Sequence, residues 1–494
     1  MIPIPGGQLM NLYRLAPEVV LCLFGMIVMV ADPFVAAARK RTLGWLALVG
    51  ALVALASVHI ANHFPGPAYS DLIHTDSFSM FLHVVILSAV VMAIFGSLDY
   101  LDQENIQRSE YYALVLFAAA GMGVLAGANE LVTAFVGLEI SSIASYVLVG
   151  FRRRSPASNE ASLKYFLLGS FATAFFLYGI AMVYGVTGTT HIQDVQAALE
   201  QAVTAGGHVP ALAILGVGLI LVGLGFKVVV SPFQIYAPDV YEGAPTPVTA
   251  LLASGPKVAT FAIMIRIFYV SFAAAQGYWF WAICVCAVLT MCIGNLGALV
   301  QTNVKRMLAY SSIAHAGYIL VAFAASTALG VAAILFYLAA YVFMKVGAFV
   351  IVTHLGQQDE KRLLIQDYSG LALKQPMVAA CFSLFLLSLL GLPATGGFVG
   401  KFFAFQAALG VSRRALVLLV VIAAINTIIG AYYYLRVIIT MYFQAPHRDY
   451  APTPVPAAVA IALIIAAAGT LYLGILPSRV WDLAQTAAGS LFPH

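Results

Sequence analysis

Charged residues are scarce in this sequence. Only 9% of its 494 residues are Asp, Glu, Lys or Arg, whereas 62% are hydrophobic. In soluble domains about a quarter of the residues are charged, so this chain has too few charged residues to cover a water-facing surface of its size. A lipid bilayer accepts such a surface when the backbone is hydrogen-bonded within helices. The composition therefore predicts an all-α, polytopic membrane protein.

Cysteines are few, and nucleotide-binding motifs are missing. The five cysteines lie in apolar runs without a CxxC pair, so neither a disulfide framework nor an iron–sulfur site is expected. Neither GxxxxGKS/T nor a strand-bound GxGxxG occurs. The net charge of +4 comes from short basic clusters between apolar runs, which argues against nucleic acid as a partner. No cofactor or metal is expected on this chain, and another chain would bind any nucleotide or redox group that drives it.

Long apolar runs fill most of the sequence. A membrane-spanning helix needs about 20 apolar residues. Fourteen segments fit, with approximate cores at 15–36, 43–63, 77–98, 111–128, 130–150, 161–186, 210–231, 246–272, 277–300, 304–325, 328–353, 376–408, 415–442 and 455–476. The longest loops, near 188–209 and 355–375, are too short to hold a soluble domain.

Basic residues in the short loops indicate the orientation. They follow the first, fifth, ninth and eleventh segments, at 39–41, 152–154, 305–306 and 361–374. With fourteen segments all of these loops lie on one side, which the positive-inside rule makes cytoplasmic. Both termini are then expected in the periplasm. Arg413 and Arg414 lie on the other side and are the main exception.

Two of the segments are interrupted beside a lysine. Lys227 precedes Pro232 by five residues, and Lys401 follows Pro393 by eight. Proline breaks a membrane helix, and transporters place ion sites at such breaks. The interrupted segments are the seventh and twelfth, which predicts two five-helix repeats of opposite topology, segments 4–8 and 9–13. The expected regions are a three-helix N-terminal region at 1–110, repeats at 111–272 and 277–442, and a C-terminal helix at 443–494.

Charged residues inside apolar segments are the strongest functional signal. The basic ones are Lys164, Lys227, Lys257, Arg266, Lys345, Lys401 and Arg436. Among acidic residues, only Glu139 is expected to lie equally deep. A charge at mid-membrane costs about 2.5–3.5 kcal/mol on insertion scales, and such residues normally mark ion pathways. We therefore expect a buried proton relay.

Lysine suits such a relay better than arginine. Burial lowers the pKa of a lysine and a nearby carboxylate raises it, so moving one neighbouring charge can switch its protonation. Arginine remains protonated. We therefore expect Arg266 and Arg436 to anchor or snorkel near segment ends.

The other relay candidates each have a simpler alternative. Glu139 shares a helical face with Ser142 and Tyr146, which indicates a hydrated interior, although a structural ion pair is the alternative. Lys164 lies early in its segment and could be an end anchor, and Lys345 could be structural. His315 has the ordinary pKa of a proton shuttle but could simply be packed.

Three segments resemble a known family, the proton-translocating antiporter-like membrane subunits of respiratory complex I (NADH:quinone oxidoreductase). These are 231–249 (SPFQIYAPDVYEGAPTPVT), 305–318 (KRMLAYSSIAHAGY) and 391–402 (GLPATGGFVGKF). The resemblance covers nearly the whole chain and implies a fourteen-helix fold with inverted repeats in a bacterial inner membrane. Within the family the chain is most similar to the N subunits. Lys401 stands where M subunits and Mrp-type antiporters are expected to have glutamate, and L subunits are longer.

The resemblance also implies residue roles. Glu139 and Lys227 correspond to the family's glutamate–lysine pair, Lys257 to its connecting lysine and Lys401 to its terminal lysine. Lys164 corresponds to a sixth-segment lysine typical of N subunits. Gln234 stands where many relatives have histidine, and because an amide cannot titrate, the sequence does not support proton entry there.

By this resemblance the chain is one subunit of a proton-pumping translocase. Quinone reduction in neighbouring subunits would drive a proton from the Glu139–Lys227 pair through Lys257, and His315, to Lys401. FMN, iron–sulfur clusters and quinone are expected on partner subunits. The expected partners are other membrane-arm subunits, in a hetero-oligomer, and the lipid bilayer. A stand-alone or Mrp-type cation/proton antiporter subunit is the alternative, and a purely structural arm subunit is a weaker one.

Overall fold

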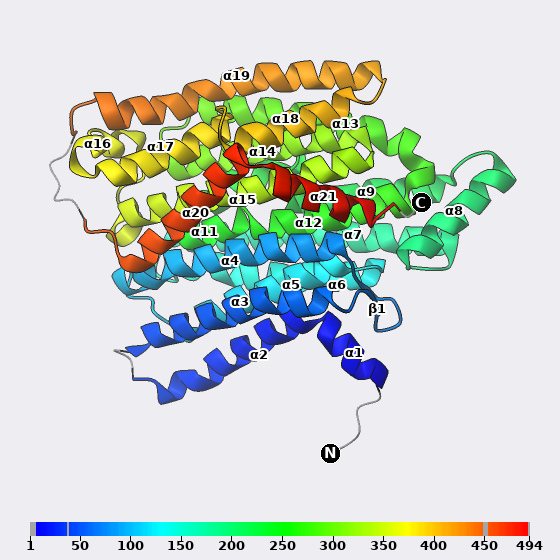
Figure 1. The fold of residues 1–494 in the computed structure, drawn as a ribbon, viewed down its shortest axis with the longest axis horizontal. Helices are drawn as coiled ribbons and strands as arrows, with labels where there is room; N and C mark the ends of the chain where they lie inside the picture. Colours follow the sequence, from blue (N-terminus) through cyan, green and yellow to red (C-terminus); the bar gives the residue numbers. More distant parts are fainter. Residues whose placement is uncertain (1–5, 37–38, 448–452, 493–494) are drawn as a thin grey trace.

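The chain folds into a bundle of long helices that run side by side (Figure 1). This computed structural model describes residues 6–36, 39–447 and 453–492. Within them, 12 helical segments are long and apolar enough to cross a membrane, and α9 (Ala211–Lys227) and α17 (Pro376–Leu390) are shorter apolar helices. The predicted all-α, polytopic membrane fold is confirmed.

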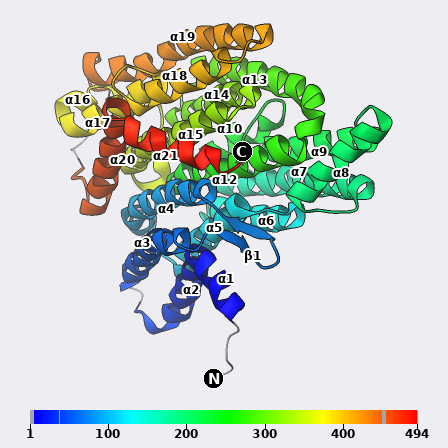
Figure 2. The same ribbon diagram turned by 45° about the vertical axis from the view of Figure 1, so that its right-hand side comes forward.

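The N-terminal helices form one edge of the bundle (Figures 1 and 2). They are α1 (Gly6–Arg14), α2 (Ala16–Ala31), α3 (Arg41–Asn62) and α4 (Ser77–Gln103). Between α3 and α4 lies a small antiparallel hairpin, β1 (Gly66–Ala68) paired with β2 (Ile73–Thr75). Asp76 caps α4 because its side chain accepts from the backbone N–H of Ser79.

The next part of the chain contains a helix that the sequence did not predict. Its elements are α5 (Ser109–Gly127), α6 (Leu131–Val149), α7 (Pro156–Thr187), α8 (Ile192–Gly206), α9, α10 (Ala237–Gly243), α11 (Thr246–Leu252) and α12 (Gly255–Arg266). The prediction of a loop near 188–209 missed α8, which projects at one end of the bundle (Figure 2). Only Ile192, Val195 and Leu199 of α8 are buried, so its apolar face is too narrow to resemble a membrane span.

The remaining helices complete the bundle up to its opposite edge, which α19 forms (Figure 1). They are α13 (Gln276–Leu299), α14 (Val304–Ala325), α15 (Ala328–Gly356), α16 (Leu371–Lys374), α17, α18 (Gly396–Leu409), α19 (Arg414–Phe443), α20 (Ala457–Ile475) and α21 (Ser478–Gly489). The amphipathic α21 packs on α4 and α15 and was also not predicted. Its exposed polar face explains why hydropathy did not reveal it.

Burial identifies the centre of the bundle. In each membrane-length segment we compare the share of buried residues in its most apolar stretch. That share is 100% in the segment Thr246–Ser271, which contains α12, and 94% in both α14 and α15. The corresponding values are 28% for the segment of α2 and 33% for α19, so most of their side chains are not buried. Most side chains of α12, α14 and α15 are therefore enclosed by protein, and a buried polar group among them must find its partners inside the bundle.

The predicted interruption in the twelfth segment separates α17 from α18. The chain turns at Gly391 with φ 97° and at Ala394 with φ 68°, on either side of Pro393. The two halves then pack so closely that a Cβ on Gly397 would lie 1.9 Å from the carbonyl oxygen of Ser388. Only glycine allows this contact between the two broken ends.

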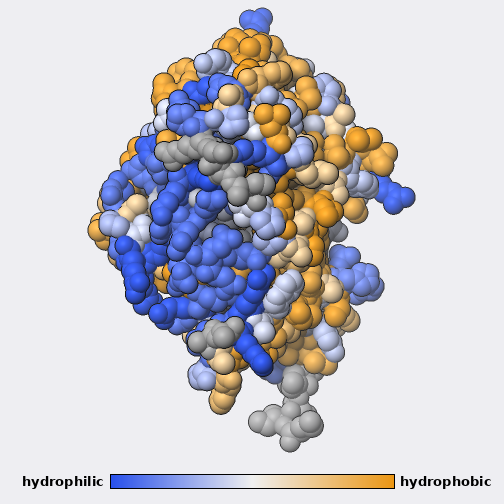
Figure 3. Space-filling model, turned by 90° about the vertical axis from the view of Figure 1, so that its left-hand side faces the viewer, coloured by the Kyte–Doolittle hydropathy of each residue, from blue (hydrophilic) through white to orange (hydrophobic). Residues whose placement is uncertain are grey.

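The basic loops gather at one end of the bundle, which forms a largely hydrophilic face (Figure 3). Arg41 at the start of α3 pairs with Asp99 near the end of α4, at 2.7 Å. Arg152 after α6 pairs with Glu104 after α4, at 3.1 Å, and contacts Glu360 after α15, at 3.6 Å. These loops therefore lie together, on the same side of the helices.

Candidate functional site

The central helix α14 presents one polar face inside the bundle. Ser311, Ser312, His315 and Tyr318 follow one another at spacings of one, three and three residues, which places them on the same side of the helix. All four are buried. Their side chains meet residues from α12, α15, α18 and α19, so this face joins the two halves of the chain.

Two of the predicted lysines donate to the serines of this face. The Nζ of Lys257 on α12 donates to the carbonyl oxygen of Ser312 at 2.7 Å and to its Oγ at 2.8 Å. The Nζ of Lys345 on α15 donates to the carbonyl oxygen of Leu308 at 2.6 Å and to the Oγ of Ser311 at 3.0 Å. Both lysines are at most 1% exposed. The sequence-predicted lysines of the two halves thus meet on one helix.

His315 lies in a hydrogen-bonded chain of hydroxyl groups. Its Nδ1 is 2.8 Å from the hydroxyl of Tyr337, and its Nε2 is 3.2 Å from the hydroxyl of Tyr434. The Tyr434 hydroxyl is also 2.5 Å from the Oγ of Ser311, the acceptor of Lys345. A neutral imidazole has one donor and one acceptor nitrogen, and each hydroxyl can both donate and accept. This arrangement can therefore pass a proton in steps.

Lys401 lies at the break between α17 and α18. Its Nζ donates to the carbonyl oxygens of Leu389 and Leu390, at 3.1 and 2.8 Å. These carbonyls are free to accept because α17 ends at Leu390. The Nζ also lies 4.6 Å from the ring centroid of Tyr318, whose ring is 5.8 Å from that of His315. Tyr318 therefore stands between Lys401 and the hydroxyl chain around His315.

Lys227 is the last residue of α9, and aromatic rings surround its amine. Its Nζ donates to the hydroxyl of Tyr165 at 3.1 Å and lies 5.2 Å from the ring centroid of Tyr146. The helix ends here because Val229 has φ 67° and Pro232 follows. Among the residues described, no hydrogen bond connects Lys227 to the serines of α14. In this conformation Lys227 is separate from the group around His315.

Glu139 does not form an ion pair with Lys227 in this structure. No ion pair within 4.0 Å joins them in the described part of the chain, and the Oε1 of Glu139 has no hydrogen-bond partner there. Glu139 is half-buried on α6, and the ring of Tyr146 on the same helix lies beside Lys227 instead. The expected glutamate–lysine pair is thus open.

Lys164 does not belong to the buried lysines, contrary to the prediction from hydropathy. Its side chain is 41% exposed and pairs with Glu160 at 2.7 Å and Asp239 at 2.8 Å. Asp239 also binds Arg306 at 2.8 Å. Burial would raise the pKa of Asp239, but the hydrogen bonds from Lys164 and Arg306 hold it below its ordinary value. Lys164 lies on a helix only partly covered by protein, which a one-dimensional pattern cannot show.

The two arginines inside apolar segments have different environments. Arg266 was predicted to anchor or snorkel near a segment end, but it does not snorkel. It is 4% exposed and forms an ion pair of 2.7 Å with Asp76 at the start of α4. Arg436 donates to the carbonyl oxygens of Leu299 and Gln301, where α13 ends. The contacts of Arg436 agree with an anchoring role, because they satisfy free carbonyls at a helix end.

The structure buries a loop carboxylate that sequence reasoning missed. Glu360 follows α15, its side chain is 6% exposed, and it pairs with Lys305 at 2.8 Å. It also accepts from the hydroxyl of Tyr100 at 2.8 Å and from the backbone N–H of Thr246 at 2.8 Å. Its position in a polar loop gave no signal of burial, because its partners come from four distant parts of the sequence.

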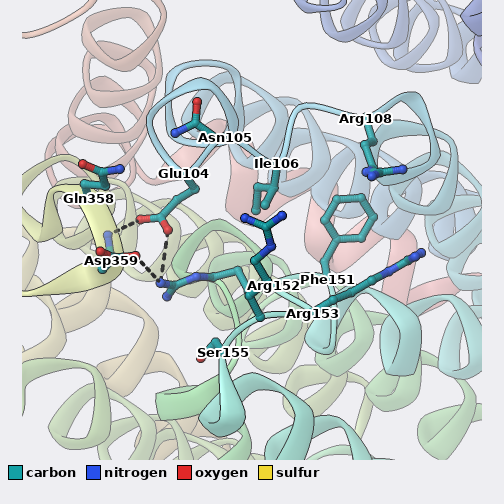
Figure 4. Close-up of a pocket in the computed structure, with 11 residues that line it drawn as sticks. Glu104, Asn105, Ile106, Arg108, Phe151, Arg152, Arg153, Ser155, Gln358 and Asp359 are labelled. Atoms are coloured by element: carbon teal, nitrogen blue, oxygen red, sulfur yellow. Dashed lines mark hydrogen bonds and ion pairs between the residues drawn. The ribbon is translucent and has the colours of Figure 1, made fainter.

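A cavity rich in arginine opens beside this cluster at the hydrophilic end. Its volume is about 630 Å³, and it is lined by Glu104, Asn105, Ile106, Arg108, Phe151, Arg152, Arg153, Arg154, Ser155, Gln358 and Asp359. Figure 4 shows Arg152 directed toward Glu104 and Asp359. Within the described residues, no group of three or more His, Cys, Asp or Glu side chains could hold a metal ion.

Two buried lysines donate to serines of the central helix α14, and His315 of the same helix bonds to tyrosine hydroxyls. The chain is therefore a polytopic membrane protein with ionisable groups in its core. Comparisons with known proteins identify the family. The family described as "NADH:quinone oxidoreductase/Mrp antiporter, TM" matches residues 128–427. The chain is 46% identical over 488 residues to NADH-quinone oxidoreductase subunit N 1 of Solibacter usitatus, covering 99% of both chains. It is 43% identical to NADH-quinone oxidoreductase subunit N of Trichlorobacter lovleyi, covering 97% of both.

Solved structures show the same fold. A chain of respiratory complex I from Thermus thermophilus superposes with a TM-score of 0.79 at 32% identity, over 95% of this chain and 99% of that chain. A chain of the Mrp complex from a Dietzia species has a TM-score of 0.82 at 24% identity, over 98% of both, and shows the fold alone. The chain belongs to the NADH:quinone oxidoreductase/Mrp antiporter family and, within it, to the subunit N proteins of NADH-quinone oxidoreductase.

Proposed function

We propose that this chain is the proton-translocating N subunit in the membrane arm of a bacterial NADH:quinone oxidoreductase. The observation that carries the proposal is the convergence of Lys257, Lys345 and His315 on one buried face of α14. Relatives with whole-length similarity are named as subunit N of that enzyme. The chain works in a hetero-oligomer with the other membrane-arm subunits. FMN, iron–sulfur clusters and quinone are bound by partner subunits.

The proposed proton path has a connected part. A proton on Lys345 passes to Ser311 and on to the Tyr434 hydroxyl, and His315 takes it up at Nε2 while releasing one at Nδ1 toward Tyr337. Lys257 feeds the same face of α14 through Ser312. Lys401, beyond the ring of Tyr318, is the terminal lysine. Hydroxyl and imidazole groups suit these steps because each can both accept and donate a proton.

The gating step lies at Glu139 and Lys227. Charge movement that follows quinone reduction in neighbouring subunits closes or opens this pair, which changes the affinity of Lys227 for its proton. The open pair supports this step, because both groups are in place and a shift of either side chain alters the field at the other. Lys227 then exchanges its proton with Lys257. Lys164 has a supporting role in this proposal, since it is held by Glu160 and Asp239.

The orientation and the repeat structure are also proposed. The hydrophilic end with the basic loops is cytoplasmic, which places both termini in the periplasm. The repeats span 111–272 and 277–442, between an N-terminal region at 1–110 and a C-terminal helix at 443–494. Support for the repeats comes from the two helix breaks, after α9 and after α17, each with a lysine beside it.

Alanine variants of the two lysines beside the helix breaks test this function. Lys227→Ala and Lys401→Ala should each abolish proton pumping in the assembled complex in proteoliposomes, while the complex still forms. Lys361→Ala, on a loop side chain that is 71% exposed, is the matched control and should pump normally. Full pumping by both buried variants would overturn the proposal. Co-purification with quinone-reducing subunits separates it from an Mrp-type antiporter.

A further inference from the structure

A buried acid and a buried imidazole meet outside the lysine group, in the N-terminal helices. The Oε1 of Glu18 on α2 lies 2.6 Å from the Nε2 of His83 on α4. Glu18 is 7% exposed and His83 is 4% exposed. The sequence analysis did not single out either residue. Glu18 lies in the first turn of α2, after Pro17, and the packing of α2 on α5 helps to enclose it.

The hydrogen bonds of His83 determine where its protons are. Its Nδ1 is 2.6 Å from the carbonyl oxygen of Ser79. A carbonyl can only accept, so Nδ1 carries a hydrogen and donates. At the other nitrogen, either Nε2–H donates to the Glu18 carboxylate, or a protonated Glu18 donates to Nε2. In both cases one proton lies between the two side chains. Without that proton, two lone pairs would face each other at 2.6 Å.

The surroundings enclose this proton. A Cβ on Gly123 of α5 would lie 2.5 Å from the Glu18 Oε1 and 3.0 Å from the His83 Nε2, so glycine lets α5 cover the pair. The other ionisable groups that act on the pair, among the residues described, are Cys22 on α2 and Asp76 at the start of α4. Arg266 of α12 already pairs with Asp76. Glu18 and His83 are therefore each other's direct ionisable partners.

We propose that Glu18 and His83 form a second proton-binding site, separate from the lysines on α14, in which the carboxylate and the imidazole share one proton. The site lies where α2 and α4 begin, at the opposite end of α4 from the hydrophilic face. Asp76 and Arg266 connect this region to α12, the helix that carries Lys257. The proposal does not depend on the lysines being a proton relay.

Infrared difference spectra of the purified complex, recorded while the pH is changed, test this site. If one proton is shared, the carboxyl signal of Glu18 and the imidazole signal of His83 change together at a single pH. Glu18→Gln should move the His83 signal, and His83→Gln the Glu18 signal, by at least about one pH unit, a tenfold change in proton affinity. His59→Gln, an exposed histidine on α3, is the control and should leave the joint change in place.

Two results would overturn the site. In the first, either signal keeps its titration pH after its partner is replaced. In the second, neither residue titrates between about pH 4 and pH 10. Should the single variants fail to assemble, the exchanged variant E18H/H83E retains both groups. It should again show one joint titration, and two independent titrations would contradict the proposal. None of these measurements uses proton pumping, so their outcome is independent of the lysine variants.

Discussion

Lys257 on α12 and Lys345 on α15 donate hydrogen bonds to consecutive serines of α14, Ser312 and Ser311. Their sequence positions are far apart, and each lies in a different predicted repeat. Because adjacent residues of one helix receive both amines, a rotation or shift of α14 would change both contacts at once. α14 therefore contacts a buried lysine from each predicted repeat.

The first prediction concerns Lys401. Lys401→Arg retains a positive charge and donors for the carbonyl oxygens of Leu389 and Leu390, but a guanidinium does not release its proton. We expect an assembled complex whose proton pumping in proteoliposomes falls at least about tenfold, equivalent to about 1.4 kcal/mol. Lys361→Arg on the exposed loop should pump as the wild type. Normal pumping by Lys401→Arg would show that Lys401 acts only as a fixed charge.

The second prediction concerns the hydroxyl chain at His315. Tyr434→Phe removes the hydroxyl that lies between Ser311 and the Nε2 of His315. Leaving a buried hydrogen-bonding group unpaired costs about 1–3 kcal/mol. If that loss falls on the transfer step, pumping slows about 5- to 150-fold. The matched control is Tyr432→Phe on the same helix, whose side chain is 61% exposed. Equal pumping rates in the two variants would place the proton path elsewhere.

The third prediction concerns the stability of the hydrophilic end. Glu360→Gln removes the ion pairs with Lys305 and Arg152 and leaves the buried Lys305 amine without its carboxylate. Breaking one side of a buried pair costs about 3–5 kcal/mol, so the unfolding midpoint of the solubilised protein should fall clearly. The control is Asp359→Asn at the neighbouring residue, whose side chain is 61% exposed, and it should leave the midpoint nearly unchanged. A similar midpoint in both variants would show that the ion pairs of Glu360 do not stabilise the fold.

The pH dependence of this cluster gives the fourth prediction. Burial would raise the pKa of Glu360, but the positive charge and hydrogen bond of Lys305 outweigh it and lower the pKa. A carboxyl with a lowered folded pKa stabilises the protein above its unfolded pKa, about 4.3, and loses that contribution as the pH falls through the folded value. The difference in thermal midpoint between wild type and Glu360→Gln should therefore shrink in acid. A constant difference from pH 7 to below about pH 4 would contradict this assignment.

The fifth prediction concerns the break between α17 and α18. Gly397→Ala would place a Cβ 1.9 Å from the carbonyl oxygen of Ser388, so the two helices must separate. Because overpacking costs about 1–3 kcal/mol, and this clash is with backbone, we expect poor assembly or displacement of Lys401. Gly410→Ala, which meets no atom closer than 3.4 Å, should assemble normally. The yield of assembled complex after purification gives the comparison.

Sequence alone was enough to predict the membrane fold, the break near Pro393 and the burial of Lys227, Lys257, Lys345 and Lys401. These features follow from local properties. An apolar run of sufficient length must form a helix in a bilayer, because its backbone groups find no other partners there. A proline must interrupt that helix because it lacks a backbone N–H and clashes with the preceding turn.

Which ionisable groups meet, and which are enclosed, depends on how the helices pack and could not be predicted from the sequence. Lys164 and Lys345 occupy similar apolar runs, yet Lys164 is partly exposed and Lys345 is fully buried. Glu18 and Glu360 lie in positions that look peripheral along the chain, yet distant helices cover them both. This difference arises because hydropathy is a sum over neighbours in sequence. Burial of a charge and the identity of its partner depend on neighbours in space.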